Sequence, residues 1–238
     1  GIVIADCWIH HNLGNGIYIR FVQGFTVRGN CVEYNNSGVT AGTAVNLAIE
    51  RNEIAENDFD GLVVSGGSRD VTIRRNLIRG HNRWGHPDNV QFFRGLENVR
   101  ILENVLIDSG QSMMMEECRG GEIRGNVIVG AEAYSLIFGH RNVHDFDVTH
   151  NTIAFSGYGN MSFTGTDYRV FDNILYPGGH GTIFSVANTE GFESDFNLFY
   201  KPPEAGGTFV AYARNWPKSY GEYRRISNQD AHTIVADP

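Results

Sequence analysis

One short pattern recurs along this chain and constrains its fold more than any other feature. The pattern reads apolar, any, apolar, any, any, Asn, any, apolar, and the segment VTIRRNLI at residues 71–78 is a clear copy. Aligning the copies gives one column of nine residues: Asp6, Asn30, Asn52, Asn76, Asn104, Asn126, Asn151, Asn173 and Asn197. A repeat interval of 22 to 28 residues is typical of a solenoid, in which each repeat forms one coil.

The residues of the repeat favour strands over helices. Apolar and polar residues alternate, as in Val71-Thr72-Ile73, and the segments are short, rich in Val and Ile, and interrupted by Gly and Asn. No segment keeps the apolar spacing of a helix over three turns, and the dense leucine scaffold of leucine-rich repeats is absent. We therefore predict an all-β solenoid, a parallel β-helix of about nine coils over residues 1–200, stacked ~4.8 Å apart.

The Asn column has a structural explanation in such a fold. A residue at the same corner of every coil can adopt the left-handed turn conformation that Asn tolerates, and its amide can donate to the equivalent amide one coil away. We therefore predict an internal Asn ladder. Cys7 and Cys31 each follow a column residue and would be coil neighbours, which permits a disulfide bond, although two free thiols are favoured.

With these repeats, the chain resembles the right-handed parallel β-helix repeat proteins, the carbohydrate-binding and sugar-hydrolase repeat group that includes many polysaccharide lyases and epimerases. Its segments 194–200 and 228–238 are similar to the C-terminal region of secreted members. The resemblance implies a single-stranded right-handed parallel β-helix of the pectin lyase-like kind, a polysaccharide partner, and a secreted or periplasmic location. It does not specify the activity, because one fold hosts several chemistries.

Composition excludes several other classes of protein. The 238 residues suit one domain, and a net charge of −8 without a basic stripe argues against nucleic acid as a partner. We find no apolar run long enough to span a membrane and no spacing typical of a structural zinc site. We expect a monomer trimmed from a longer precursor, with residues 201–238 as a tail that packs on or caps the coils.

A second register follows the Asn column by about ten residues. It predicts the inward positions Ile17, Val39, Leu62, Val90, Met113, Leu136, Met161 and Ile183. The distance from the Asn column to this register is 9 to 11 residues except in the fourth coil, where it is 14 because residues 82–87 are inserted. Since loops inserted over a rigid scaffold often carry function, we predict a site on the outward face of coils four to six.

Two groups of ionisable residues align on that outward face. Asp60 and Asp88 occupy the same position on adjacent coils, so their carboxyl groups would raise the pKa of one of them or share a calcium ion, the one cofactor that the sequence supports. Arg94, Glu117 and His140 form a second column over three consecutive coils. Both groups also have a purely structural interpretation, as turn caps and as a surface salt-bridge ladder.

Elimination or epimerisation of a uronic acid needs a base for the C5 proton, a group that neutralises the carboxylate, and a proton donor. The only two lysines, Lys201 and Lys218, lie beyond the coils, which disfavours a lysine base. His86 or His140 could instead serve as the base, with Arg83 or Arg94 and Gln91 against the carboxylate. The candidate catalytic residues are His86, Asp88, Arg94 and His140, and the candidate substrate-binding residues are Arg83, Trp84, Gln91, Glu116, Glu117 and Tyr134.

Two other functions stay open at this stage. A glycoside hydrolase needs two carboxyl groups, roughly 5 Å apart for retention of configuration, and Asp60 with Asp88 could provide that spacing. A non-catalytic carbohydrate-binding solenoid would instead present exposed aromatic side chains along its groove, which Tyr18, Trp84, Phe93 and Tyr134 supply only in part.

Overall fold

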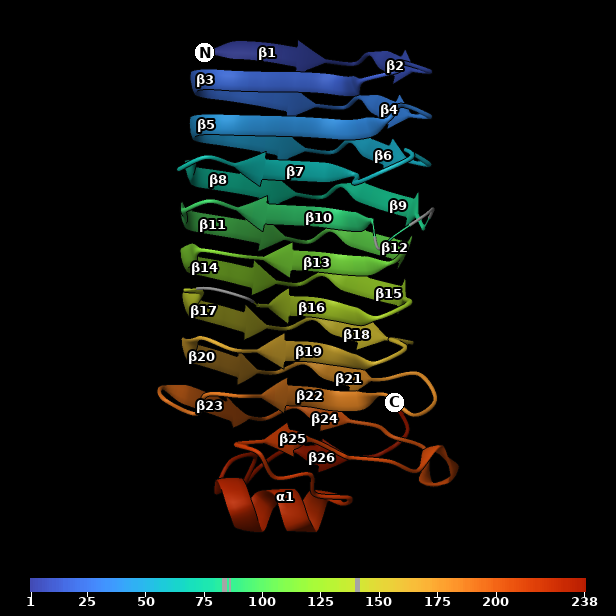
Figure 1. Cartoon of the computed structure of the whole chain (residues 1–238), viewed down its shortest axis with the longest axis vertical. Coiled ribbons are helices and arrows are strands. Elements are labelled where there is room, and N and C mark those ends of the chain that lie inside the picture. The colour runs from blue at the N-terminus through green and yellow to red at the C-terminus, as the bar shows by residue number, and fades with distance from the viewer. Residues whose placement is uncertain (83–84, 86, 140–141) are drawn as a thin grey trace.

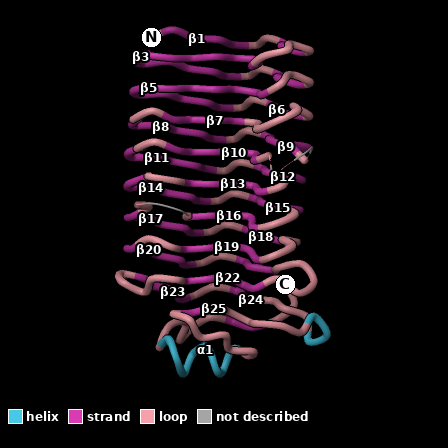
Figure 2. The backbone as a smooth tube through the Cα atoms, viewed as in Figure 1, coloured by secondary structure: helices cyan, strands magenta, loops and turns pink. Residues whose placement is uncertain are grey.

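The chain winds into a right-handed parallel β-helix of about nine coils, which confirms the predicted fold class (Figure 1). The structure is a computed structural model that describes residues 1–82, 85, 87–139 and 142–238. Strands stack along the long axis from the N-terminal end, and one helix lies at the opposite end (Figures 1 and 2). Among the described residues there is no helix with the length and apolar character that a membrane crossing requires.

Three faces of parallel strands run along this axis. The first face contains the N-terminal parts of β3 (Asn15–Arg28) and β5 (Ser37–Glu50), followed by β7 (Leu62–Ser65), β10 (Asp88–Phe93), β13 (Gln111–Met115), β16 (Tyr134–Phe138), β19 (Gly159–Phe163), β22 (Thr182–Val186) and β25 (Ala211–Tyr212). The second face contains β1 (Ile2–Ala5), the C-terminal parts of β3 and β5, β8 (Arg69–Arg74), β11 (Leu96–Leu102), β14 (Cys118–Arg124), β17 (His144–Thr149), β20 (Thr166–Phe171) and β23 (Phe192–Asp195).

The third face is a separate ten-stranded sheet. It contains β2 (Trp8–His10), β4 (Cys31–Glu33), β6 (Glu53–Ala55), β9 (Leu77–His81), β12 (Val105–Ser109), β15 (Val127–Ala131), β18 (Thr152–Ala154), β21 (Ile174–Tyr176), β24 (Leu198–Phe199) and β26 (Ile234–Val235). The corners between faces are short, so each coil brings its apolar side chains to one continuous core.

The predicted Asn ladder is present and runs from Asn30 to Asn197. Each ladder amide donates to the side-chain oxygen of the next ladder residue at 2.9–3.1 Å, and that same oxygen also accepts the backbone N–H of the donating residue. The amide makes a further bond to a backbone carbonyl of the preceding coil, as from Asn104 to Ile73 at 3.0 Å. The ladder therefore satisfies buried polar groups at one corner of every coil.

Two details of the ladder prediction were wrong. The left-handed conformation belongs to the residue before each ladder Asn, such as Arg51 (φ 55°) and Arg75 (φ 55°). Asp6 (φ 56°) is one of these preceding residues, and Cys7 takes the ladder position of the first coil, where its N–H donates to Asn30 Oδ1 at 3.1 Å. The first-coil alignment was thus one residue early, because Asp resembles Asn in the pattern but does not face the interior here.

The same offset changes the interpretation of the cysteines. Cys31 pairs in register with Trp8, so Cys7 and Cys31 are not at equivalent positions of neighbouring coils. Both are free thiols, as the sequence favoured.

The inward register of the first face is confirmed in seven of its eight positions. Ile17, Val39, Leu62, Val90, Met113, Leu136 and Met161 pair in series along the face, and all are at most 4% exposed. In the last coil Phe184 pairs with Met161 in place of the predicted Ile183. The prediction failed there because the turn before β22 is one residue longer than the repeat implied.

A second buried polar ladder crosses the corner between the third and first faces. Asn12 donates to Asn35 at 2.8 Å, Asn35 donates to Asn57 at 3.1 Å, and Asn57 Nδ2 lies 3.2 Å from His81 Nε2. His81 Nδ1 lies 2.9 Å from Asn89 Oδ1. The neutral imidazole with its hydrogen on Nδ1 satisfies both contacts, and burial lowers the pKa of His81 to about 4.

His81 should make stability depend on pH. Between the ordinary pKa near 6.5 and the folded value of about 4, the unfolded chain binds a proton that the folded protein does not, so stability falls as pH drops through this window. Urea unfolding at pH 7 and pH 4.5 should show that wild type loses about 2 kcal/mol more than His81→Asn, whose amide can continue the ladder. The matched substitution at the exposed His150, His150→Asn, should leave the pH dependence as in wild type; an equal response of both variants would contradict the assignment.

The tail beyond residue 200 contacts the last coils. It contains η1 (Pro203–Ala205) and α1 (Tyr220–Ser227), whose N-cap Ser219 accepts from Glu222 N at 3.3 Å. The buried Asp230 accepts from Tyr223, Thr233 and Ser194 at 2.6–3.0 Å. Thr233 in turn accepts the N–H of Asn197, the last ladder residue, at 3.0 Å. These contacts supply the bonds that a further coil would otherwise make to the ladder; the boundary at residue 200 itself stays a prediction.

Candidate active site

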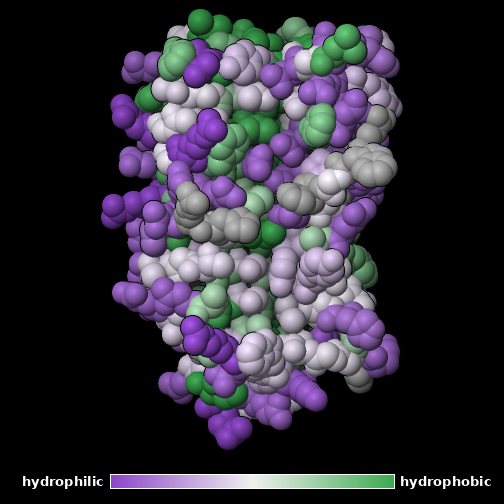
Figure 3. Space-filling model, in the orientation of Figure 1, coloured by the Kyte–Doolittle hydropathy of each residue, from purple (hydrophilic) through white to green (hydrophobic). Residues whose placement is uncertain are grey.

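The outward side of the first face carries two rows of side chains over the predicted site. One row begins the strands and contains Asn15, Ser37, Asp60, Asp88, Gln111, Tyr134, Gly159 and Thr182. The other lies three residues further along and contains Tyr18, Thr40, Val63, Gln91, Met114, Ile137, Ser162 and Ser185. Figure 3 shows this face, on which apolar side chains appear along the middle and hydrophilic ones gather toward the edges.

Asp88 is the most unusual residue of these rows. It begins β10 directly after the inserted loop, and it is only 1% exposed. Its backbone N–H donates to Asp60 Oδ1 at 2.8 Å, and its backbone carbonyl accepts from Gly61 at 2.9 Å, so the main chain is anchored to the coil before. Its side-chain Oδ1 is enclosed and has no hydrogen-bond partner among the described residues. Buried polar atoms of this kind are rare in folded proteins and often have a functional cause.

The carboxyl group of Asp88 is held in its neutral form. Burial raises its pKa to about 9, and the negative charges of Asp60 and Glu116 add to the effect. A carboxylic acid that stays protonated at neutral pH can donate a hydrogen bond or a proton. The sequence predicted that one of the two aspartates would have a raised pKa; the structure identifies Asp88 and adds burial as the larger cause.

Three neighbours complete the polar surroundings of Asp88. Gln111 is its partner in register on β13, is 8% exposed, and has an enclosed Oε1 without a hydrogen-bond partner among the described residues. Glu116 lies just beyond β13, where its N–H donates to Phe92 at 2.9 Å. Tyr134 begins β16, half-buried over Gly159, and burial raises the pKa of its hydroxyl. Asp88 thus has a carboxylate on the coil before it, Asp60, another on the coil after it, Glu116, and Gln111 beside it in register.

Part of the predicted site takes a different form. Arg94 and Glu117 occupy corresponding turn positions with φ of 67° and 54°, but within the described part of the chain no ion pair joins them. Arg94 is exposed and its guanidinium carbon lies 5.3 Å from the ring centre of Phe93. Gln91 is partly exposed on the second row. The predicted positions Arg83, Trp84, His86 and His140 lie outside the described residues.

Two of the outward residues are less exposed than the side chains of an open sugar-binding surface would be. Val63 is 8% exposed and Met114 is 6% exposed, although both belong to the outward row. Tyr18 is exposed at 60%, far along the face from Asp88. Val63 and Met114 thus present little surface to a ligand on the coils on either side of Asp88.

The predicted calcium ion finds little support in this geometry. Among residues 1–82, 85, 87–139 and 142–238, no group of three His, Cys, Asp or Glu side chains lies close enough to hold a metal ion. Calcium prefers charged carboxylates, whereas Asp88 is neutral and one oxygen of Asp60 already accepts the N–H of Asp88.

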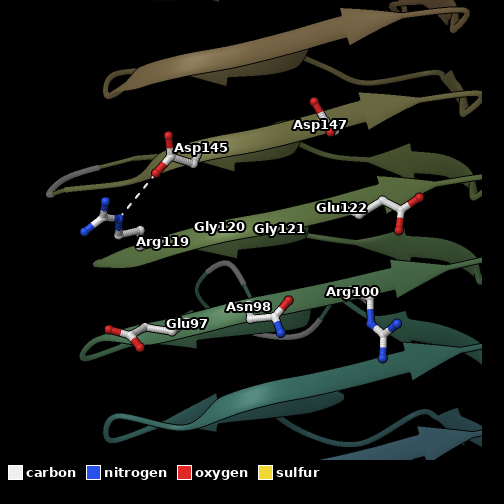
Figure 4. Close-up of a pocket in the computed structure, with 9 residues that line it drawn as sticks. All are labelled: Glu97, Asn98, Arg100, Arg119, Gly120, Gly121, Glu122, Asp145 and Asp147. Atoms are coloured by element: carbon white, nitrogen blue, oxygen red, sulfur yellow. Dashed lines mark hydrogen bonds and ion pairs between the residues drawn. The ribbon is translucent and has the colours of Figure 1, made fainter.

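A groove lined by described residues lies elsewhere, on the second face over β11, β14 and β17 (Figure 4). It encloses about 600 Å³ above Gly120 and Gly121. Arg119 pairs there with Asp145 at 3.3 Å, and both side chains are about half exposed or more. Exposed ion pairs of this kind stabilise little and are common on protein surfaces. The buried, neutral carboxyl group of Asp88 is therefore a stronger indication of a functional site than the volume of this groove.

Comparisons with known proteins agree with the fold. Residues 1–92 match the family model "Right handed beta helix region". The A-module of the mannuronan C-5 epimerase AlgE6 from Azotobacter vinelandii aligns with a TM-score of 0.66 at 14% identity, over 100% of this chain and 65% of that one. The periplasmic alginate epimerase AlgG aligns with a TM-score of 0.54 at 8% identity, over 90% and 59% of the two chains.

An alginate lyase from Paenibacillus sp. also aligns, with a TM-score of 0.51 at 14% identity over 85% of this chain and 78% of that one. No curated protein sequence matches significantly. The chain thus spans about two thirds or less of the two epimerases. At these identities the likeness establishes the right-handed β-helix.

Proposed function

We propose that this protein is a carbohydrate-active enzyme, a lyase or C5-epimerase of a uronate-containing polysaccharide, with its site around Asp88 on the first face. The observation that carries the proposal is the buried, neutral carboxyl group of Asp88, which follows the inserted residues 82–87 directly in the sequence. A uronate brings its own negative charge, and a neutral acid can approach it and donate to it where an ionised aspartate would repel it.

The first step removes the C5 proton and moves its electron pair toward the uronate carboxylate. The resulting enediolate carries additional negative charge on the carboxylate oxygens, and a hydrogen bond from Asp88 to one of them would stabilise it. Gln91, on the same strand three residues further on, is assigned to the same carboxylate. We assign the base to His86 or His140 on sequence grounds, with Arg83 or Arg94 as the cation that offsets the charge.

The second step decides between the two activities. In a lyase, the electron pair forms a C4=C5 double bond while the C4–O4 bond breaks and the leaving oxygen takes a proton. In an epimerase, C5 takes a proton on its opposite face and no glycosidic bond breaks. Tyr134, one coil beyond Gln111, is a candidate for that proton because its half-buried hydroxyl stays protonated at neutral pH.

The comparisons support the proposal through the activities for which similar structures are named. Two are named as alginate or mannuronan epimerases and one as an alginate lyase. A polysaccharide partner, a secreted or periplasmic location and a monomeric state are parts of the same proposal, since a polymeric substrate of this kind lies outside the cytoplasm.

Incubation with a panel of alginate, pectate, glycosaminoglycans and neutral glycans tests the reaction. We expect one uronate polymer to give either the ultraviolet absorbance of an unsaturated uronate, which identifies a lyase, or solvent deuterium at C5 by NMR without chain cleavage, which identifies an epimerase. The neutral glycans are the control and should give neither signal. Absence of both signals on every uronate polymer would overturn the proposal.

A glycoside hydrolase remains a second candidate because of one specific contact. Asp60 and Asp88 lie on adjacent coils, with Asp88 neutral as a general acid must be, and Asp60 directly bonded to its backbone. Release of reducing ends from the same panel without ultraviolet absorbance would favour this function over the first.

A further inference from the structure

Two enclosed oxygen atoms without partners lie on adjacent coils beneath the proposed site. They are Asp88 Oδ1 on β10 and Gln111 Oε1 on β13, and their residues are partners in the strand register. The only other such side-chain atom among the described residues, Asn160 Oδ1, lies on β19. Paired parallel strands are ~4.8 Å apart, so the two side chains start side by side from the sheet.

An unsatisfied buried oxygen destabilises a protein, and two of them in neighbouring positions call for a shared explanation. In the orientation that the Gln111 amide has in the structure, both atoms are acceptors as long as Asp88 is ionised, so neither can satisfy the other. One proton on Asp88 removes the conflict, because the carboxylic acid then donates an O–H to the carbonyl oxygen of Gln111. The register, the burial and the orphaned atoms all lead to this arrangement.

We propose that Gln111 is the positioning residue of the site: its side-chain carbonyl accepts the proton of the Asp88 acid and holds that proton ready for the substrate. The amide nitrogen of Gln111 makes no hydrogen bond to a described residue and is not among the enclosed atoms without partners, so it can donate outward to the substrate. The catalytic consequence rests on the proposed function; the proton shared by Asp88 and Gln111 does not.

The arrangement also explains how the acid could be used. With its proton directed at Gln111, Asp88 keeps its other oxygen for a hydrogen bond from the substrate. When a carboxylate binds, the O–H can turn from Gln111 to that stronger acceptor, and no proton has to enter from solvent. Gln111 would thereby affect the rate of the chemical step without exchanging a proton itself.

The infrared absorption of the Asp88 carboxyl group, on protein with isotope-labelled aspartate, measures this arrangement directly. The band of a protonated carboxyl that is lost in Asp88→Asn identifies the residue. In Gln111→Met, which keeps the length but has no acceptor, we expect this band to move to the frequency of a carboxyl without a hydrogen bond. We also expect the pKa of Asp88 to fall by about one unit, since the neutral form loses its partner.

Two further variants make the test decisive. Gln111→Asn keeps a polar side chain that is too short to reach the Asp88 carboxyl group, so it should shift the band as Gln111→Met does. Agreement of the two variants would show that the shift does not come from misfolding caused by the apolar methionine. Gln23→Met, the same change at an exposed glutamine of β3, should leave band and titration unchanged. An Asp88 band that is identical in wild type and in both Gln111 variants would overturn the proposal, as would an Asp88 that is ionised at pH 7 in wild type.

The spectrum separates this inference from the proposed function, because it needs no substrate. A shifted band together with no turnover on any polysaccharide would leave the Asp88–Gln111 contact standing and remove the lyase or epimerase. Where turnover is found, Gln111→Met should lower kcat about tenfold with a smaller change in KM, and the alkaline limb of the pH profile should move to lower pH. A change in KM alone would contradict the positioning role.

Discussion

Asp88→Asn is expected to lower turnover by about 10²- to 10⁴-fold while leaving the protein folded. Asn has the same shape as the neutral acid, and its amide can donate to Gln111 Oε1 as the protonated carboxyl would. The backbone bond from residue 88 to Asp60 does not involve the side chain and should persist. The variant therefore removes the transferable proton and little else. Initial rates on the uronate polymer that proves active in the panel measure the loss.

The same variant should become more stable than wild type as the pH rises. The pKa of Asp88 is about 9 in the folded protein and near 3.8 in the unfolded chain, so between these values the folded state holds a proton that the unfolded state has lost. Wild-type stability consequently decreases as pH increases through this window, and Asn has no such dependence. At pH 8 we expect Asp88→Asn to be more stable by at least about 2 kcal/mol, and at pH 4 the two should agree within about 0.5 kcal/mol.

The matched control is Asp145→Asn on the second face. Asp145 is exposed in a left-handed turn that Asn tolerates, and its loss removes one surface ion pair to Arg119. We expect turnover close to wild type and a stability change under about 0.5 kcal/mol at either pH. Turnover by Asp88→Asn above about a tenth of wild type would show that an amide donor replaces the carboxylic acid and that the acidic proton of Asp88 is not needed for the reaction.

Asn104→Ala should have the largest effect on stability, a loss of about 3–5 kcal/mol. Asn104 lies at the middle of the ladder, where it donates to Asn126 and to Ile73 O and accepts from both nitrogens of Asn76. Truncation leaves several buried polar groups without partners, each of which costs about 1–3 kcal/mol when unsatisfied. Urea unfolding at neutral pH measures the change, together with circular dichroism to show that the β-helix is retained.

Asn12→Ala is the comparison for Asn104→Ala, because it removes an exposed asparagine from a hydrogen-bonded ladder instead of a buried one. Asn12 is the exposed first residue of the shorter ladder and donates only to Asn35, at 3.1 Å from its backbone and 2.8 Å from its side chain. Water can replace the side-chain bond, so we expect a loss below about 1 kcal/mol. Similar losses in the two variants would mean that the interior ladder contributes no more than an exposed hydrogen bond.

Much of the fold was predictable because each coil of a β-helix repeats the same pattern of apolar and polar residues. The Asn column and the inward register each depend on spacing along one coil, and they failed only in the first and last coils, at Asp6 and Ile183. There the pattern is degenerate, since Asp replaces Asn in one case and two apolar residues, Ile183 and Phe184, are adjacent in the other. Local spacing cannot decide between such neighbours.

The sequence suggested where on the fold a candidate site lies, but not which residues have an unusual environment there. The inserted residues before Asp88 directed attention to coils four to six, and the alignment of Asp60 with Asp88 predicted a raised pKa for one of the two carboxyl groups. Gln111 stood in the same row but was not selected, because a glutamine acquires significance only when its oxygen is shown to be enclosed. The place of His81 in a buried ladder was not predicted, because that ladder has no constant sequence pattern.

The sequence by itself determined the coil, its inward register, and the residues that stack at the ladder corner. Those properties follow from periodicity, because the same residue pattern occurs in every repeat. Only the tertiary structure decided which of two aligned aspartates is buried and neutral, and which glutamine lies beside it without a partner. The physical reason is that burial and pKa depend on what surrounds a side chain from coils 22 to 28 residues away in sequence, and no single repeat contains that information.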